Sequence, residues 1–173
     1  MKVGEKKRLE GDVPFERVTR RQRAKCEELV LAAIHGLADD DSNEEIITLV
    51  ERELSQEPLS NAFKVQLYIH GAKSLAHLDY WETAIEYAYA GMSFADNDPE
   101  LVVEFLQLLI EASFELENHG QAYRFAQEAL SHVDRKDDRY SDLMESYLLA
   151  QVELAEDSTK KAGCFLQLAK HYE

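Results

Sequence analysis

The feature that most constrains this chain is a helix-start signal that recurs at nearly constant intervals. It occurs at Ser42–Glu45, Asp79–Glu82 and Asn118–Gln121, each time with a capping residue three positions before Glu or Gln. In such a capping box the first side chain accepts a hydrogen bond from a first-turn N–H, and the Glu or Gln reaches back. A weaker fourth start, Asp157 or Ser158, follows at a similar interval. Starts in phase predict a repeated helical unit.

Small residues line one face of the helix predicted after each start. They are Ala84, Ala88 and Gly91 in the second unit, Ala122, Ala126 and Ala129 in the third, and Ala162 and Ala169 in the last. A longer helix with an apolar stripe precedes each start, as in Val65, Tyr68, Ile69, Ala72, Leu75 and Ala76. Because small side chains let a second helix approach closely, the pattern predicts hairpins that pack against one another.

We expect eight helices in four hairpins: 21–37 with 43–56, 60–78 with 80–95, 99–117 with 119–133, and 138–155 with 158–172. The segment 100–117 is apolar nearly all round, which predicts a helix covered on both flanks in the middle of the stack. The sequence has only 7 Gly and 3 Pro, so we expect one domain over 21–173. Residues 1–20 are expected to form a basic leader. It is either a flexible tail or a segment that folds back onto the acidic groove of its own or a neighbouring chain.

The charge of the chain is unevenly placed. The net charge is −15, but the segment 1–25 carries nine bases and four acids, which leaves −20 for the remainder. An acidic body repels phosphates, so we expect no direct binding of nucleic acid, and a basic or mixed partner rather than an acidic one. No run of 18 apolar residues occurs and the amino terminus is polar, which predicts a cytoplasmic protein without a membrane segment. In a reducing cytosol, Cys26 and Cys164 are expected to be small core residues.

The segment at 79–87, DYWETAIEY, resembles the turn and second-helix opening of the tetratricopeptide repeat. Pro58, twelve residues beyond Ile46, fits the closing proline of that family. The resemblance covers roughly 26–172 and implies an all-α, right-handed α-solenoid of about four tetratricopeptide-like hairpins. The units are longer than the usual length of about 34 residues, and Ala72 or Ile110 stands where the family has a glycine. In unit length the chain is also similar to peptide-pheromone receptors of Gram-positive bacteria.

Motifs that would indicate catalysis or metal binding are absent from the sequence. None of the six histidines has Glu three residues before it, and no H-E-x-x-H, Gly-rich phosphate loop, G-x-S-x-G or closely spaced Cys pair occurs. We therefore expect a protein that is not an enzyme and holds no metal or cofactor. The Asp39–Asp41 run lacks the glycine and distal Glu of a calcium loop and is interpreted as a solvated turn. Trp81 and Tyr87 are expected to pack between helices, and Tyr89 to be exposed.

The resemblance also implies where a ligand would lie, since the first helix of each hairpin lines the concave face of such arrays. The positions it implies for a peptide-binding groove are Gln66, Ile69, His70, Lys73, Glu104, Gln107, Leu108, Glu111, Tyr147, Leu148 and Gln151. Each has the alternative interpretation of plain solvated or packing surface. The family's Lys and Asn clamp for a carboxylate is not reproduced, because Lys73 stands alone and Glu104 and Glu111 would repel an anion.

Two functional hypotheses follow from the sequence. The leading one is a non-catalytic scaffold or adaptor that binds a protein or peptide segment in its concave groove. The alternative is a peptide-sensing regulator without its own DNA-binding domain, since no helix-turn-helix fits before residue 26. The last helix carries Phe165, Leu166, Leu168 and Tyr172 with no further helix to cover them, which makes a homodimer a third expectation.

Overall fold

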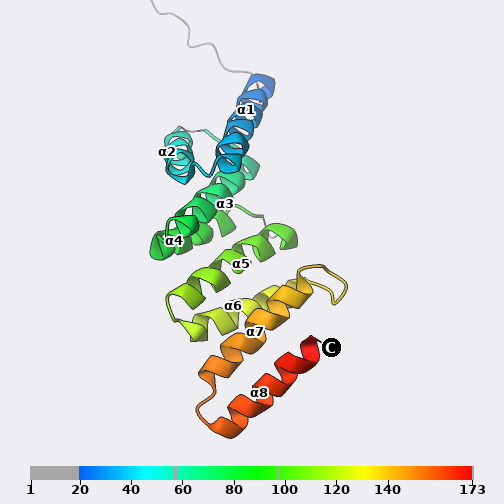
Figure 1. The fold of residues 1–173 in the computed structure, drawn as a ribbon. Coiled ribbons are helices and arrows are strands. Elements are labelled where there is room, and N and C mark those ends of the chain that lie inside the picture. The colour runs from blue at the N-terminus through cyan, green and yellow to red at the C-terminus, as the bar shows by residue number, and fades with distance from the viewer. Residues whose placement is uncertain (1–19, 57, 97, 173) are drawn as a thin grey trace, which may run out of the picture.

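The fold is seen in a computed structural model that describes residues 20–56, 58–96 and 98–172, and these residues form eight helices and no strand (Figure 1). The helices are α1 (Arg20–Asp39), α2 (Asn43–Leu54), α3 (Asn61–His77), α4 (Trp81–Met92), α5 (Pro99–Glu115), α6 (His119–His132), α7 (Tyr140–Leu154) and α8 (Ser158–His171). The all-α class is confirmed, and every helix boundary falls within three residues of its predicted position. The leader expected at residues 1–20 lies outside the described residues, apart from Arg20 at the start of α1.

The helices pack in the order in which they follow one another along the chain. Each contacts the next, and the odd-numbered helices also contact each other in series: α1 with α3, α3 with α5, and α5 with α7. Figure 1 shows the hairpins following one another from α1 at the top of the view to α8 at the bottom. Among the described residues, α1 and α8 therefore each have one flank without a neighbouring hairpin.

The turns inside the first three hairpins share one backbone conformation. Asp41, Asp79 and Glu117 have φ values of 55°, 62° and 54°, in the left-handed region. After each, the next residue donates its backbone N–H to a carbonyl five positions earlier: Ser42 to Leu37, Tyr80 to Leu75, and Asn118 to Ser113. This is the Schellman closure that ends many helices. The interval from Asp41 to Asp79 equals that from Asp79 to Glu117, so the repeat is more regular than the predicted starts.

The predicted capping boxes are only partly correct. Asn118 Oδ1 accepts from the backbone N–H of Gln121 at 3.3 Å, as expected. Ser42 stands at the N-cap of α2 without a side-chain cap hydrogen bond. In the second unit the prediction is wrong by one residue, because Tyr80 is the N-cap of α4 and Asp79 is the left-handed residue before it. At the fourth turn Asp157 is the cap, and it accepts from Lys160 N at 2.7 Å.

Small residues let the central helices approach closely, as predicted. Ala88, Ala122, Ala126 and Ala129 are 0% exposed and Ala84 is 3% exposed. A Cβ atom at Gly91 would lie 2.3 Å from Cζ of Phe105, so the Phe105 ring of α5 occupies the space that the glycine of α4 leaves. In the same way, the Tyr87 ring occupies the space that Gly71 of α3 leaves, and it would lie 2.8 Å from a Cβ atom added at Gly71. The close approach in this first helix therefore comes from Gly71, next to the Ala72 noted in the sequence.

The sequence predicted the burial of three aromatic residues correctly but overestimated the burial of side chains in α1 and α8. Trp81 and Tyr87 are half-buried and Tyr89 is 50% exposed, as predicted. Cys26 is exposed and Cys164 is half-buried, so the prediction of two core cysteines is wrong. Ala162 and Ala169 of α8 are exposed, unlike the alanines of α4 and α6. The common reason is that α1 and α8 each have a flank that no other hairpin of the described residues covers.

Candidate functional site

A cleft of about 500 Å³ opens over the odd-numbered helices, between α3, α5 and the turn that leads into α7. We call it the α3–α5 cleft. Its lining residues are Lys73 and His77 of α3, Glu100, Leu101, Glu104, Gln107, Leu108 and Glu111 of α5, and Arg139 at the N-cap of α7. Five of the predicted groove residues are brought together here: Lys73, Glu104, Gln107, Leu108 and Glu111.

The helical period of α5 explains this lining. Glu100, Glu104, Gln107, Leu108 and Glu111 lie at i, i+4, i+7, i+8 and i+11 and so share one face. The opposite faces of α5 are filled by core residues, namely Val103, Phe105, Leu106, Leu109 and Ile110. Leu108 is only 9% exposed, so it forms the floor of the cleft, and the acidic and amide side chains form its wall.

Both basic residues of the cleft lining are held by carboxylates. Lys73 Nζ lies 2.6 Å from Glu104 Oε1, a pair that joins α3 to α5 across two hairpins. The partner of Lys73 is thus a carboxylate of the cleft itself. Arg139 Nη2 lies 2.7 Å from Asp137 Oδ2 and 3.4 Å from Glu100 Oε1. Hydrogen bonds from the Arg139 side chain and backbone lower the pKa of Asp137 to about 2.

A second hollow, of about 310 Å³, continues the cleft toward α7. It shares Gln107 and Glu111 with the α3–α5 cleft, and its other lining residues are Ile110, Phe114, Glu115, Asp142, Leu143 and Ser146. Its charged lining consists of Glu111, Glu115 and Asp142, so among the residues the structure describes this end of the path is purely acidic. The two hollows together run across three odd-numbered helices, with mixed charge at one end and negative charge at the other.

The predicted α3 residues Gln66, Ile69 and His70 are not among the residues that line the cleft. Ile69 is 2% exposed and belongs to the core. Gln66 is half-buried one turn before His70. The His70 ring packs edge-on against His35, with 5.0 Å between ring centroids. Burial lowers the pKa of His70, and the neighbouring His35 and Lys73 lower it further, while Glu104 opposes them.

The residues predicted on α7 lie away from this path. Tyr147 stacks on Tyr123 of α6 with 4.8 Å between ring centroids, and their hydroxyl oxygens are 3.0 Å apart. That hydrogen bond, with burial, raises the pKa of Tyr147 to about 12. Leu148 is 6% exposed, in the core. Gln151 lines a different cavity, described below.

The register of the repeat shows why these α7 positions were misplaced. Adding the interval between Asp79 and Glu117 to the predicted α3 positions gives Glu104, Gln107, Leu108 and Glu111 of α5. Adding it once more gives the equivalent α7 positions, Asp142, Glu145, Ser146 and Leu149. Asp142 and Ser146 do line the second hollow. The equal spacing of the left-handed turn residues is therefore the signal that would have found them. Arg139 was also missed, because it reaches the cleft from a turn rather than from a helix face.

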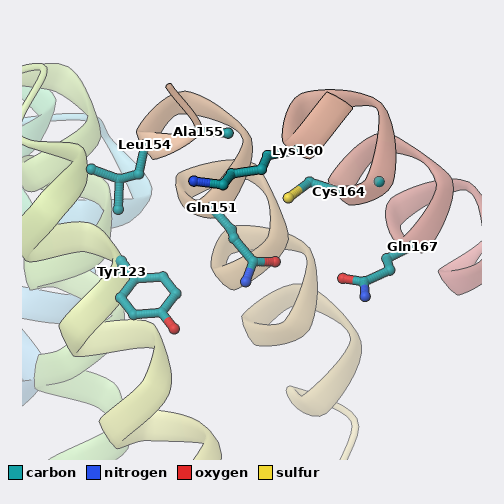
Figure 2. A pocket seen from close by; sticks show the side chains of 8 residues that line it. Tyr123, Gln151, Leu154, Ala155, Lys160, Cys164 and Gln167 are labelled. Carbon is teal, nitrogen blue, oxygen red and sulfur yellow. The ribbon is translucent and has the colours of Figure 1, made fainter. Parts of the chain in front are cut away.

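A third cavity, of about 470 Å³, lies between α6, α7 and α8 (Figure 2). Tyr123 and Leu154 stand on one side of Gln151, and Cys164 and Gln167 stand on the other. Its remaining lining residues are Ala155, Lys160 and Gly163. Gln151 Oε1 is buried, and no hydrogen-bond partner for it occurs among the described residues. This cavity lies beside the even-numbered helices and is separate from the α3–α5 cleft.

Comparisons with protein family models, with curated proteins and with solved structures gave no match to this chain. Within the described ranges, no group of three or more His, Cys, Asp or Glu side chains is placed to hold a metal ion. Over the same residues, none of the helices combines the length and apolar character needed to cross a membrane. The chemistry of the site therefore has to be argued from its own side chains.

Proposed function

We propose that this protein is a non-catalytic scaffold or adaptor that binds a polypeptide segment along the α3–α5 cleft and the hollow that continues it. The observation that carries the proposal is the shared lining of the two hollows by Gln107 and Glu111, which makes one path over three helices. An extended segment suits a path of this kind, since a concave surface built by stacked hairpins is long and shallow.

Two features support a tetratricopeptide-like solenoid as the framework. The left-handed residue of each of the first three hairpin turns recurs at one constant interval. The odd-numbered helices contact each other in series, as the first helices of stacked repeats do. In this framework the odd-numbered helices line the inner surface, which is where the two hollows lie.

The charges along the path define the chemistry of the partner. Glu111, Glu115 and Asp142 attract a basic stretch at the α7 end. At the other end, the partly exposed Lys73–Glu104 and Arg139–Glu100 pairs can be exchanged for pairs with acidic or basic side chains of the partner. Exposed ion pairs of this kind contribute only about 0–1 kcal/mol each, so their exchange is easy. The partner segment is therefore basic or mixed in charge.

One observation favours a second function, that of a peptide-sensing regulator. The Lys73–Glu104 ion pair joins successive odd-numbered helices across a hairpin boundary. A ligand that displaced this pair would change the contact between α3 and α5 and so the curvature of the stack. A displaced pair with unchanged helix positions on ligand binding would favour the scaffold.

Selection of short random peptides on the full chain tests the scaffold proposal. We expect the enriched peptides to be basic or mixed and to lose affinity by about tenfold or more with Glu111→Lys/Glu115→Lys. The matched control is Glu82→Lys/Glu86→Lys on α4, which has the same spacing and equally exposed side chains and should bind like the parent. The proposal fails if no peptide is enriched, or if both double variants bind the enriched peptides equally.

A further inference from the structure

The last helix presents an apolar stripe to solvent. Phe165, Leu166 and Tyr172 are 54%, 57% and 62% exposed, and the exposed Ala162 and Ala169 complete the stripe. None of the fourteen described residues of α8 is buried. The helix is nonetheless attached to α7, because Nε2 of His171 lies 3.2 Å from Oγ of Ser141. We call these five apolar residues the α8 stripe.

The α8 stripe corresponds to the side of α6 that receives the next hairpin. Aligning the two helices at their capping residues places Ala162, Phe165, Ala169 and Tyr172 of α8 at the positions of Tyr123, Ala126, Leu130 and Val133 of α6. In α6 this side faces α7: Tyr123 stacks on Tyr147, and Ala126 belongs to the same core cluster as Leu143. The α8 stripe is therefore the place where a further odd-numbered helix would pack.

The charge around the stripe indicates what kind of helix fits. Lys161 and Lys170 lie at the two edges of the stripe, and no Asp or Glu occurs between Ser158 and Tyr172, in a chain of net charge −15. Lys160 lies on the other side of α8, where it lines the cavity beside α7, 3.8 Å from Asp157. A second α8 would bring the same lysines and be repelled. The uncovered α1 of a second copy starts with arginines, including Arg21 and Arg23, which antiparallel packing would set against Lys170. An acidic helix has the complementary charge.

We propose that the α8 stripe docks an amphipathic helix of a partner protein, with an apolar face flanked by acidic residues, in the position of a fifth odd-numbered helix. This mode of recognition lays the apolar face of a helix on a matching apolar surface and reads it through anchors at i, i+3, i+4 and i+7. The surface lies on the end helix and uses none of the residues of the α3–α5 cleft.

The probe is a synthetic helix of about 18 residues, with Leu at the anchor positions, Glu at the positions that flank them and Ala elsewhere for helix propensity. Its control is the same peptide with Lys in place of Glu. Binding to the full chain is measured by fluorescence anisotropy. The two peptides are compared on the chain that carries Glu111→Lys/Glu115→Lys, so that the Lys peptide is not bound by the acidic hollow. There we expect the Glu peptide to bind at least about tenfold more tightly than the Lys peptide. Phe165→Ser/Leu166→Ser should abolish binding of the Glu peptide, and Lys161→Glu/Lys170→Glu should reverse the preference.

The matched control for the stripe is Leu29→Ser/Tyr89→Ser, which removes apolar side chains that are 62% and 50% exposed elsewhere. This variant should bind the Glu peptide like the parent. Glu111→Lys/Glu115→Lys in the cleft should also bind the Glu peptide like the parent, so that a failure of this proposal can be told apart from a failure of the proposed function. Equal affinity for the two peptides, or no binding of either, overturns the proposal. So does a doubling of mass, or binding to phosphatidylserine vesicles, that Phe165→Ser/Leu166→Ser abolishes, because a second copy or a membrane would then occupy the stripe.

Discussion

At the scale of single residues, two ring pairs decide which side chains are available to a ligand. His70 packs against His35 and is drawn toward α1, and Tyr147 is held against Tyr123 and drawn toward α6. Both had been predicted in the groove because the resemblance to the tetratricopeptide repeat implies these positions. Sequence spacing gives the face on which a residue lies but not the neighbour that its ring meets, and these neighbours come from other helices, far away along the chain.

The pKa of His70 makes a prediction about stability and pH. Burial, His35 and Lys73 hold this pKa below 6.5 in the folded chain, so the unfolded chain binds a proton more readily at that residue. Neutral His70 therefore contributes its full stabilisation above about pH 6.5, and this stabilisation is lost as the pH falls toward the pKa that His70 has in the folded chain. We expect His70→Gln to flatten the fall of the urea midpoint between about pH 7.5 and 5.5. The exposed His132→Gln is the control, and an unchanged slope in His70→Gln would contradict the assignment.

At the scale of helices, the close approach of α3, α4 and α5 depends on Gly71 and Gly91, and Gly91 gives the clearest test. An alanine Cβ at Gly91 would meet Phe105 at 2.3 Å and Tyr68 at 2.8 Å. We expect Gly91→Ala to lower the free energy of unfolding by about 1–3 kcal/mol, the usual effect of overpacking. Gly36→Ala is the matched control, since nothing lies within 4 Å of its Cβ, and it should raise stability by up to about 1 kcal/mol through helix propensity. Equal effects of the two substitutions in urea denaturation would show that α4 and α5 are not packed this closely.

The helices themselves were predictable because their signals are local. Apolar periodicity and Pro99 located α5, and the small residues of α6 were correctly placed in the core. The register of the units was less predictable. The sequence signal for a cap points to Asp79 rather than Tyr80, and only the left-handed backbone at Asp79 shows that Tyr80 is the residue that precedes the helix. The α7 positions that the family resemblance implies lie one or two residues from those that the uniform interval gives.

At the scale of the whole molecule, burial is greatest in the middle of the stack. Nine residues of α3 and eight of α5 are buried, whereas none of the described residues of α8 is. Because local opening follows the number of buried apolar contacts, we expect amide hydrogen exchange to be slowest in α3 and α5 and to become faster toward α8. Mass spectrometry of exchanged peptides measures this directly. Uniform protection from α5 to α8 would contradict it, and slower exchange of α8 alone on adding the acidic helix would mark the docked state.

The sequence by itself determined the all-helical class, the eight helices and the small residues of the core, because each of these follows from spacing within one turn or one hairpin. The tertiary structure decided the rest. It placed Arg139 in the cleft from a turn, paired Lys73 with Glu104, and left Cys26 exposed. It also showed that the repeat interval is uniform through three turns. These outcomes depend on backbone conformation at single turn residues and on which flank of a helix lacks a neighbour, and neither is a local property of the chain.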